Sequence, residues 1–143
     1  MQHPEHPWID ATHAPVYVFA YPHHDPNVPE QANRYAAEHA SVFEVLKKWT
    51  PTRCAPYSFI TDLTHLQVST PLSRRRATEY LAHSRRKANP FSVCRAYVGS
   101  GEAHRILTAV FWQAPPEYPY VIVPTRAEAL VWVQAQMRAA ITG

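Results

Sequence analysis

Glycine, cysteine and long apolar runs are scarce in this 143-residue sequence, and each scarcity excludes a class of site or protein. The three glycines are too few for a glycine-rich phosphate cradle, and neither a GxSxG sequence nor a P-loop lysine is present. Cys54 and Cys94 stand far apart without a CxxC pair, which favours reduced thiols over a disulfide or a zinc site. Because no uninterrupted apolar stretch is long enough to span a bilayer, we expect a soluble protein.

Charged residues are also sparse, and the net charge alone does not indicate a class of binding partner. Charged residues make up 17% of the chain and the net charge is +3. The first residues lack the basic start and apolar core of a secretory signal, which predicts a cytoplasmic location. The length suits one domain, and we expect it over residues 15–143, with an amino-terminal extension over residues 1–14.

What the chain does contain is a regular alternation of strand-like and helix-like segments. Runs rich in β-branched and aromatic residues predict strands over residues 15–22, 56–64, 92–99 and 118–124. Apolar side chains at three- and four-residue steps predict helices over residues 29–49, 70–88, 102–113 and 125–141. The segment 102–113 also fits a strand, but we favour the helix. The order βαβαβαβα predicts an α/β fold, with a four- to five-stranded, mostly parallel or mixed sheet and helices packed on it.

Three stretches carry a resemblance to a known family. They are FITDLTHL at residues 59–66, AHRILTAVFW at residues 103–112 and VIVPTRAEALVWV at residues 121–133. Together with the element order, they resemble the STAS-like domain family (sulfate transporter and anti-sigma-factor antagonist), in the branch that is grouped with Sec14-like domains. The resemblance covers roughly residues 15–140. It implies a STAS-like fold and a non-enzymatic regulatory or adaptor module that binds another protein.

In the family, the strand that FITDLTHL resembles ends in an Asp-Leu-Ser-type turn, and anti-sigma antagonists hold a phosphorylated serine at the start of the helix after it. The resemblance therefore also points to phosphorylation after this turn. This chain lacks the acidic residue and the glycine of that helix start. Ser69, Thr70 and Ser73 are the candidate phosphoacceptors, because a phosphate there would lie near a helix N-terminus. The alternative, which we favour, is that Thr70 is only the N-cap and the serines are turn residues.

The helix predicted over residues 70–88 carries two basic triplets, residues 74–76 and 85–87. Eleven residues separate them, which is about three helical turns, so they should stack into one basic ridge. The candidate binding residues of the ridge are Arg74, Arg75, Arg85 and Arg86. An anionic ligand, a membrane surface or an acidic partner would fit it, although a solvated face is the commoner explanation. No aromatic residues interleave with the cations, which argues against nucleic acid.

The tryptophans suggest both core and surface positions. Trp49 and Trp112 lie on apolar helix faces and are predicted in the core. Trp132 lies well round the last helix from its apolar stripe, so it is a candidate anchor for a partner or for a homodimer. The alternative is that Trp132 packs beside Trp8 under the amino-terminal segment.

Polar residues at loop positions give two weaker site hypotheses. Asp62, Thr64 and His65 follow a predicted strand and could line a small pocket, although such an aspartate more often caps its own turn. The run from His23 to Asp25 is predicted as a polar loop rather than a metal site, because adjacent side chains on an extended chain diverge. We expect no cofactor and no metal.

Two alternatives to a partner-binding module stay open. One is a protein that binds a small apolar or lipid ligand, which a cavity lined by Tyr57, Phe59 or Trp112 at the carboxyl ends of the strands would favour. The other is a metal-dependent enzyme that uses a nonlocal cluster drawn from the nine histidines.

Overall fold

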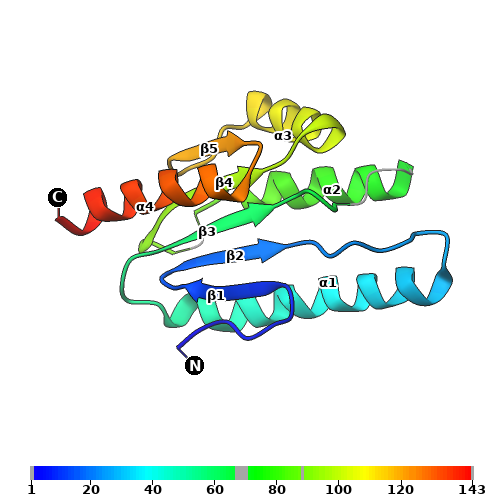
Figure 1. Cartoon of the computed structure of the whole chain (residues 1–143), viewed down its shortest axis with the longest axis horizontal. Helices are drawn as coiled ribbons and strands as arrows, with labels where there is room; N and C mark the ends of the chain where they lie inside the picture. The colour runs from blue at the N-terminus through cyan, green and yellow to red at the C-terminus, as the bar shows by residue number, and fades with distance from the viewer. Residues whose placement is uncertain (1, 67–70, 88, 143) are drawn as a thin grey trace.

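From residue 16 onward, strands and helices alternate along the chain as the sequence pattern predicts, and one additional strand precedes them (Figure 1). The structure is a computed structural model that describes residues 2–66, 71–87 and 89–142. The elements are β1 (Ile9–His13), β2 (Val16–Ala20), α1 (Pro29–Trp49), β3 (Tyr57–Asp62), α2 (Pro71–Ser84), β4 (Ser92–Val98), α3 (Gly101–Gln113), β5 (Tyr120–Val123) and α4 (Arg126–Thr142). A short 3-10 turn, Thr50–Thr52, follows α1. The predicted α/β class is confirmed.

The five strands form one mixed sheet in the order β1-β2-β3-β4-β5. β1 is antiparallel to β2, and the other neighbours are parallel. Because crossovers between parallel strands are right-handed, strands that follow one another in one direction place their connecting helices on the same face. α1, α2 and α3 accordingly pack on one face of the sheet, and α4 covers the other.

β1 is the strand that the pattern of the sequence did not predict. Only Ile9 and Ala11 of its five residues are apolar, so it has little intrinsic strand signal. Its conformation comes from pairing with the edge of β2, where the Ala20 N–H also donates to the carbonyl of Trp8. Pairing with the adjacent strand, rather than its own residue pattern, therefore decides this element.

The second helix ends at Ser84, four residues before the predicted end at residue 88. The carbonyls at its end are taken by partners outside the helix. The Ser84 carbonyl accepts hydrogen bonds from the Tyr118 hydroxyl and the Arg95 guanidinium, and the Arg85 carbonyl accepts one from the Glu117 N–H. These contacts satisfy the last carbonyls, and the chain leaves the helix there.

The sheet has a different core on each face. The face under α1, α2 and α3 is mainly aromatic, with Tyr17, Phe19 and Phe59 among its buried residues. The face under α4 is aliphatic and includes Val18 and Val133. No helix among the described residues has both the length and the apolar character to cross a bilayer.

Candidate functional site: a groove between α1 and α2

A groove of about 940 Å³ lies over the aromatic face of the sheet, between α1 and α2. Its floor comes from three adjacent strands and consists of Phe19, Tyr57, Phe59, Thr61, Ser92 and Arg95. Its walls and rim consist of His39, Phe43, Leu46, Lys47, Thr50, Pro51, Arg76, Glu79, Tyr80, His83, Ser84, Arg86 and Lys87. The groove thus combines an aromatic floor with a rim that carries several cations.

The strand register builds the floor. Tyr17 of β2 lies opposite Phe59 of β3, and Phe59 lies opposite Arg95 of β4, so these residues form a row across three strands. The register shifts between β3 and β4, because Tyr57 pairs with Ser92 whereas Phe59 pairs with Arg95. This bulge leaves one extra residue on β4, so Ser92 and Arg95 both reach the groove although they are three residues apart.

Arg95 is the charged residue of the floor. Its guanidinium lies 5.7 Å from the ring centroid of Phe59 and 5.5 Å from that of Tyr118. It donates a hydrogen bond of 3.3 Å to the carbonyl of Ser84, at the C-terminus of α2. Within the described part of the chain, no aspartate or glutamate forms an ion pair with it. The groove floor therefore contains a half-buried cation that forms no ion pair with a described aspartate or glutamate.

The charge of Arg95 is permanent. Burial by itself would lower the pKa of the guanidinium, but the pKa of arginine lies so far above neutrality that Arg95 stays charged at pH 7. A fully buried ion costs several kcal/mol in desolvation, and Arg95, which is half-buried without a described anionic partner, bears part of that cost. An anion that entered the groove would reduce this cost.

A network of hydroxyl groups holds the Arg95 end of the groove in place. The Tyr118 hydroxyl donates to the Ser84 carbonyl and lies 2.5 Å from the Tyr97 hydroxyl, which in turn lies 3.2 Å from the hydroxyl of Ser84. Burial raises the pKa of Tyr118, so this hydroxyl stays protonated and can donate. The network ties the last turn of α2 to β4 and fixes the backbone carbonyl that Arg95 contacts.

The rim of the groove is basic. Its cations are Lys47, Arg76, Arg86 and Lys87, and Glu79 is the one carboxylate among the lining residues. His39 adds no charge at neutral pH, because burial and the nearby Arg76 lower its pKa to about 4. The potential around the groove is therefore expected to attract anions.

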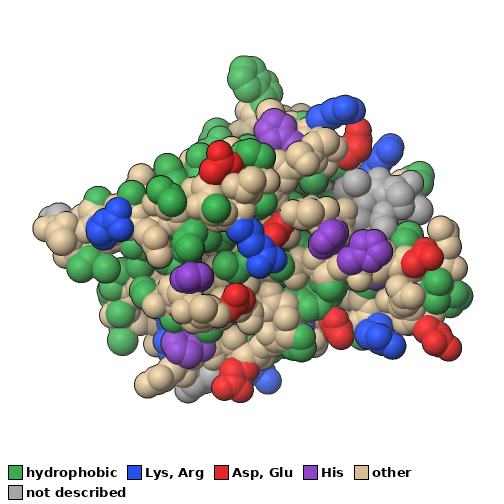
Figure 2. Space-filling view, viewed as in Figure 1, with side chains coloured by type: hydrophobic (Ala, Val, Ile, Leu, Met, Phe, Trp, Pro, Cys, Tyr) green, Lys and Arg blue, Asp and Glu red, His purple; other side chains and the backbone are tan. Residues whose placement is uncertain are grey.

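The structure corrects the prediction of a basic ridge. Because α2 ends at Ser84, Arg85 and Arg86 lie beyond the helix and do not stack on Arg74 and Arg75. Of the four predicted ridge residues, Arg86 lines the groove. On the face seen in Figure 2, basic side chains are interspersed with acidic ones and form no patch of one sign.

Asp62 acts as a cap of its own turn, the role that the sequence favours. Its carboxylate accepts hydrogen bonds from the Thr64 N–H at 3.0 Å and the Thr64 hydroxyl at 2.5 Å, and it pairs with Arg126 at 2.5 Å. Burial alone would raise the pKa of Asp62, but the Thr64 and Arg126 contacts outweigh it and keep the pKa below its ordinary value. The side chain of His65, the third residue of this hypothesis, is exposed to solvent.

The candidate phosphoacceptors are only partly covered by the structure. Ser69 and Thr70 lie outside the described residues. Ser73 lies half-buried in the first turn of α2.

The tryptophans occupy unexpected positions. Trp49 is buried, as predicted, but the prediction for Trp112 is wrong, because its side chain is 88% exposed. Phe111 takes the core position of α3, and the next residue lies about 100° further round the helix, on the solvent side. Trp132 is half-buried against the aliphatic face. Trp8 lies on the opposite face, where its indole donates to Glu38 at 2.7 Å, so the proposed pairing of Trp8 with Trp132 is also wrong.

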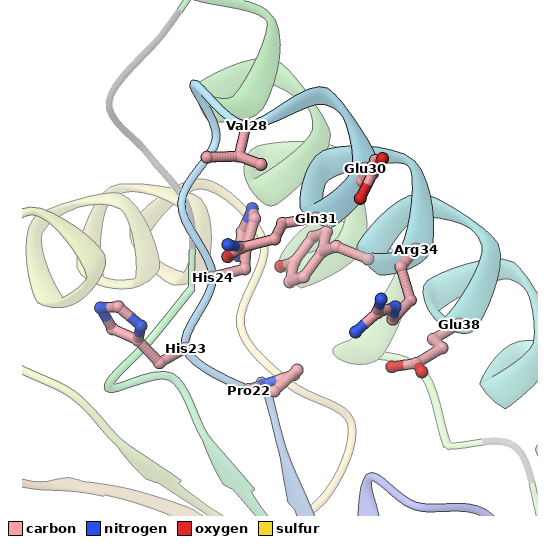
Figure 3. A pocket seen from close by; sticks show the side chains of 9 residues that line it. Pro22, His23, His24, Val28, Glu30, Gln31, Arg34 and Glu38 are labelled. Atoms are coloured by element: carbon pink, nitrogen blue, oxygen red, sulfur yellow. The ribbon is translucent and has the colours of Figure 1, made fainter.

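His23, His24 and Asp25 form a loop between β2 and α1, as predicted. Figure 3 shows that His23 points away from His24, whose ring stacks on Tyr35 at a centroid distance of 3.9 Å. His24 and Tyr35 line a second, smaller cavity of about 440 Å³. Among the residues that the structure describes, no three His, Cys, Asp or Glu side chains are placed to hold a metal ion.

In comparisons with known proteins, no family model, no curated protein and no solved structure matches this chain. The groove therefore has to be interpreted from its own chemistry. Arg95 is not among the site residues that the sequence predicted. The signal for it is an arginine inside the otherwise uncharged strand SVCRAYV.

Proposed function

We propose that the protein is a non-enzymatic module that binds a small amphipathic anion in the groove between α1 and α2. The observation that carries this proposal is Arg95, a half-buried cation on an aromatic floor that forms no ion pair with a described carboxylate. Of the functions that the sequence leaves open, this one is closest to the small apolar or lipid ligand. The groove is lined by Tyr57 and Phe59 but not by Trp112, and it lies on the sheet face rather than at the carboxyl ends of the strands.

The size and surface of the groove suit such a ligand. A volume of about 940 Å³ falls within the range of small-molecule sites, which is roughly 300–1,000 Å³. Tyr57 and Phe59 in the floor and Phe43 and Leu46 in the wall offer apolar surface, and burial of such surface favours binding by about 25 cal/mol per Å². The basic rim adds attraction at long range, which raises the rate of association with an anion.

Regulation through another protein is the second part of the proposal. The STAS-like resemblance implies a module that acts by binding a partner. From β2 onward the structure has the βαβαβαβα order expected from the sequence, with β1 as an additional strand before it. A ligand between α1 and α2 would contact both helices, so it can alter the surface that they present. In this scheme the ligand controls the binding of the partner protein.

The groove can be tested with an amphipathic aromatic sulfonate, 1-anilinonaphthalene-8-sulfonate, as a fluorescent probe. We expect one probe molecule to bind per chain, and binding should be lost when Leu46→Trp fills the wall of the groove. Val131→Trp is the matched control, because Val131 is 70% exposed on α4. Circular dichroism checks that both variants fold.

Two results would contradict the proposal. One is the absence of saturable probe binding to the wild-type protein. The other is equal binding to the Leu46→Trp variant and the wild type, because the probe would then occupy another part of the surface.

A further inference from the structure

We infer that the ligand is an amphipathic monocarboxylate that enters the groove head first, with its carboxylate paired to Arg95 on the floor and its apolar body between α1 and α2. This inference rests on the proposed function and names its ligand class and orientation. It depends on the position of Arg95, on the number of cations at the floor and on the exposure of the cations at the rim.

The floor matches a single carboxylate. Arg95 is the one cation among the floor residues, and its planar guanidinium has five N–H donors. One donor is engaged with the Ser84 carbonyl at 3.3 Å. A guanidinium and a carboxylate form two parallel hydrogen bonds, which fixes the orientation of both groups. A phosphate dianion would bring a second negative charge to a floor that offers no second cation.

The rim explains the orientation. Arg76, Arg86 and Lys87 are exposed to water, so their charges are already solvated. A carboxylate gains little from pairing with such exposed cations, because water already solvates their charges and screens the pair. Arg95, in contrast, is packed between the rings of Phe59 and Tyr118 and has lost much of its water. The larger gain in free energy therefore comes from placing the charged head on the floor.

The apolar body then follows the walls. Phe43 and Leu46 of α1 face the groove and are half-buried, and Tyr80 faces it from α2. The rings of Phe43 and Tyr80 lie 5.5 Å apart, so the two helices touch at this point and the groove continues from there toward Thr50 and Pro51. An alkyl or aryl group that lies along this path covers apolar side chains that water now contacts.

The test is displacement of the bound sulfonate probe by two ligands with the same chain, dodecanoate and dodecanol. The wild-type protein should bind dodecanoate at least about tenfold more tightly than dodecanol, because a hydrogen bond to a charged group contributes on the order of 1.5–3 kcal/mol. Arg95→Met should abolish this preference and leave the affinity for dodecanol within about threefold of the wild type. Replacing a buried charge by an apolar side chain of similar length is often neutral for stability.

Two further variants separate the position of the charge from its geometry. Arg95→Lys keeps the charge without the planar fork, so its preference for dodecanoate should fall between those of the wild type and Arg95→Met. Arg86→Gln tests the rim and should lower the affinity for dodecanoate by less than about threefold, since exposed pairs contribute little. Arg138→Gln, at an exposed position of α4 outside the groove lining, is the matched control.

The outcomes distinguish this inference from the proposed function. If Arg86→Gln removes the preference and Arg95→Met retains it, the head lies at the rim and the inference is overturned, while the groove remains a ligand site. If dodecanol binds as tightly as dodecanoate to the wild type, the carboxylate assignment is wrong. If neither ligand displaces the probe although Leu46→Trp blocks the probe, the ligand class is wrong but the groove is not.

Discussion

The two faces of the sheet are built from different side chains. The face under α4 is packed with small aliphatic residues, and Ala96, Ala129 and Val133 have no accessible surface. The face under α1, α2 and α3 carries an aromatic cluster that includes Trp8, Tyr21 and Trp49. One helix closes the first face, whereas three helices leave the groove open on the second.

The difference shows how side-chain shape affects closure of a face. Small aliphatic side chains let α4 approach the strands closely, so they form a densely packed layer. Large rings hold the opposing helices further from the sheet, and they meet at edges and tilted angles, as Tyr17 and Trp49 do at 78°. A face of this kind leaves space between neighbouring helices, and we assign the binding function to it.

The largest expected effect is on stability, and it tests whether the two faces are packed as differently as they look. Met137→Ala, on the closed face, should lower the free energy of unfolding by about 2–5 kcal/mol, because it leaves a cavity around a side chain that is 4% exposed. Leu46→Ala, in the groove wall, should lower it by about 1 kcal/mol, because that side chain already borders open space. Urea denaturation measures both values, and equal losses would mean that the groove is closed in solution.

A smaller loss of stability is expected in acid, and its source is His39 in the groove wall. The folded pKa of His39 is about 4, below the ordinary value of 6.5, so the unfolded chain binds more protons between these values. Stability should therefore fall by about 1–2 kcal/mol as the pH drops from 7 to 4.5, after allowance for the partial exposure of the ring. His39→Gln should remove most of this slope in urea denaturation series at several pH values, and an unchanged slope would show that another group is responsible.

The smallest expected effect is at the ion pair between Asp62 and Arg126, which joins the end of β3 to the start of α4. Arg126→Gln should lower the free energy of unfolding by about 0.5–1 kcal/mol at pH 7, because the arginine side chain is 53% exposed. Since the folded pKa of Asp62 is lowered, this contribution is present above pH 3.8 and is lost as the pH falls below that value. Denaturation at pH 7 and pH 3 should show the loss, and a constant difference between wild type and variant would exclude the pair as its source.

Several features were predictable because local sequence encodes them. α1 begins at Pro29 and ends at Trp49, as its apolar period and its first-turn proline indicate. Thr125 and Glu128, three residues apart at the start of α4, have the sequence pattern of a capping box, and the Glu128 N–H donates to the Thr125 hydroxyl. Asp62 caps its own turn because an aspartate side chain can accept a hydrogen bond from the residue two positions later, here Thr64.

Other features depended on contacts outside their own segment. β1 exists because it pairs with β2, and α2 ends early because Tyr118 and Glu117 bind its last carbonyls. Trp112 looked like a core residue from its neighbours, but Phe111 occupies the position that faces the sheet. None of these outcomes is visible in a window of a few residues.

The sequence by itself determined the order of strands and helices, the α/β class and most helix starts, because hydrophobic period and capping chemistry act between near neighbours. Only the tertiary structure decided which face is aromatic, where the groove lies and that Arg95 lies in its floor without a described carboxylate as partner. These depend on strand register, on the bulge in β4 and on the space between α1 and α2, all of which arise from packing between segments that are distant in the chain.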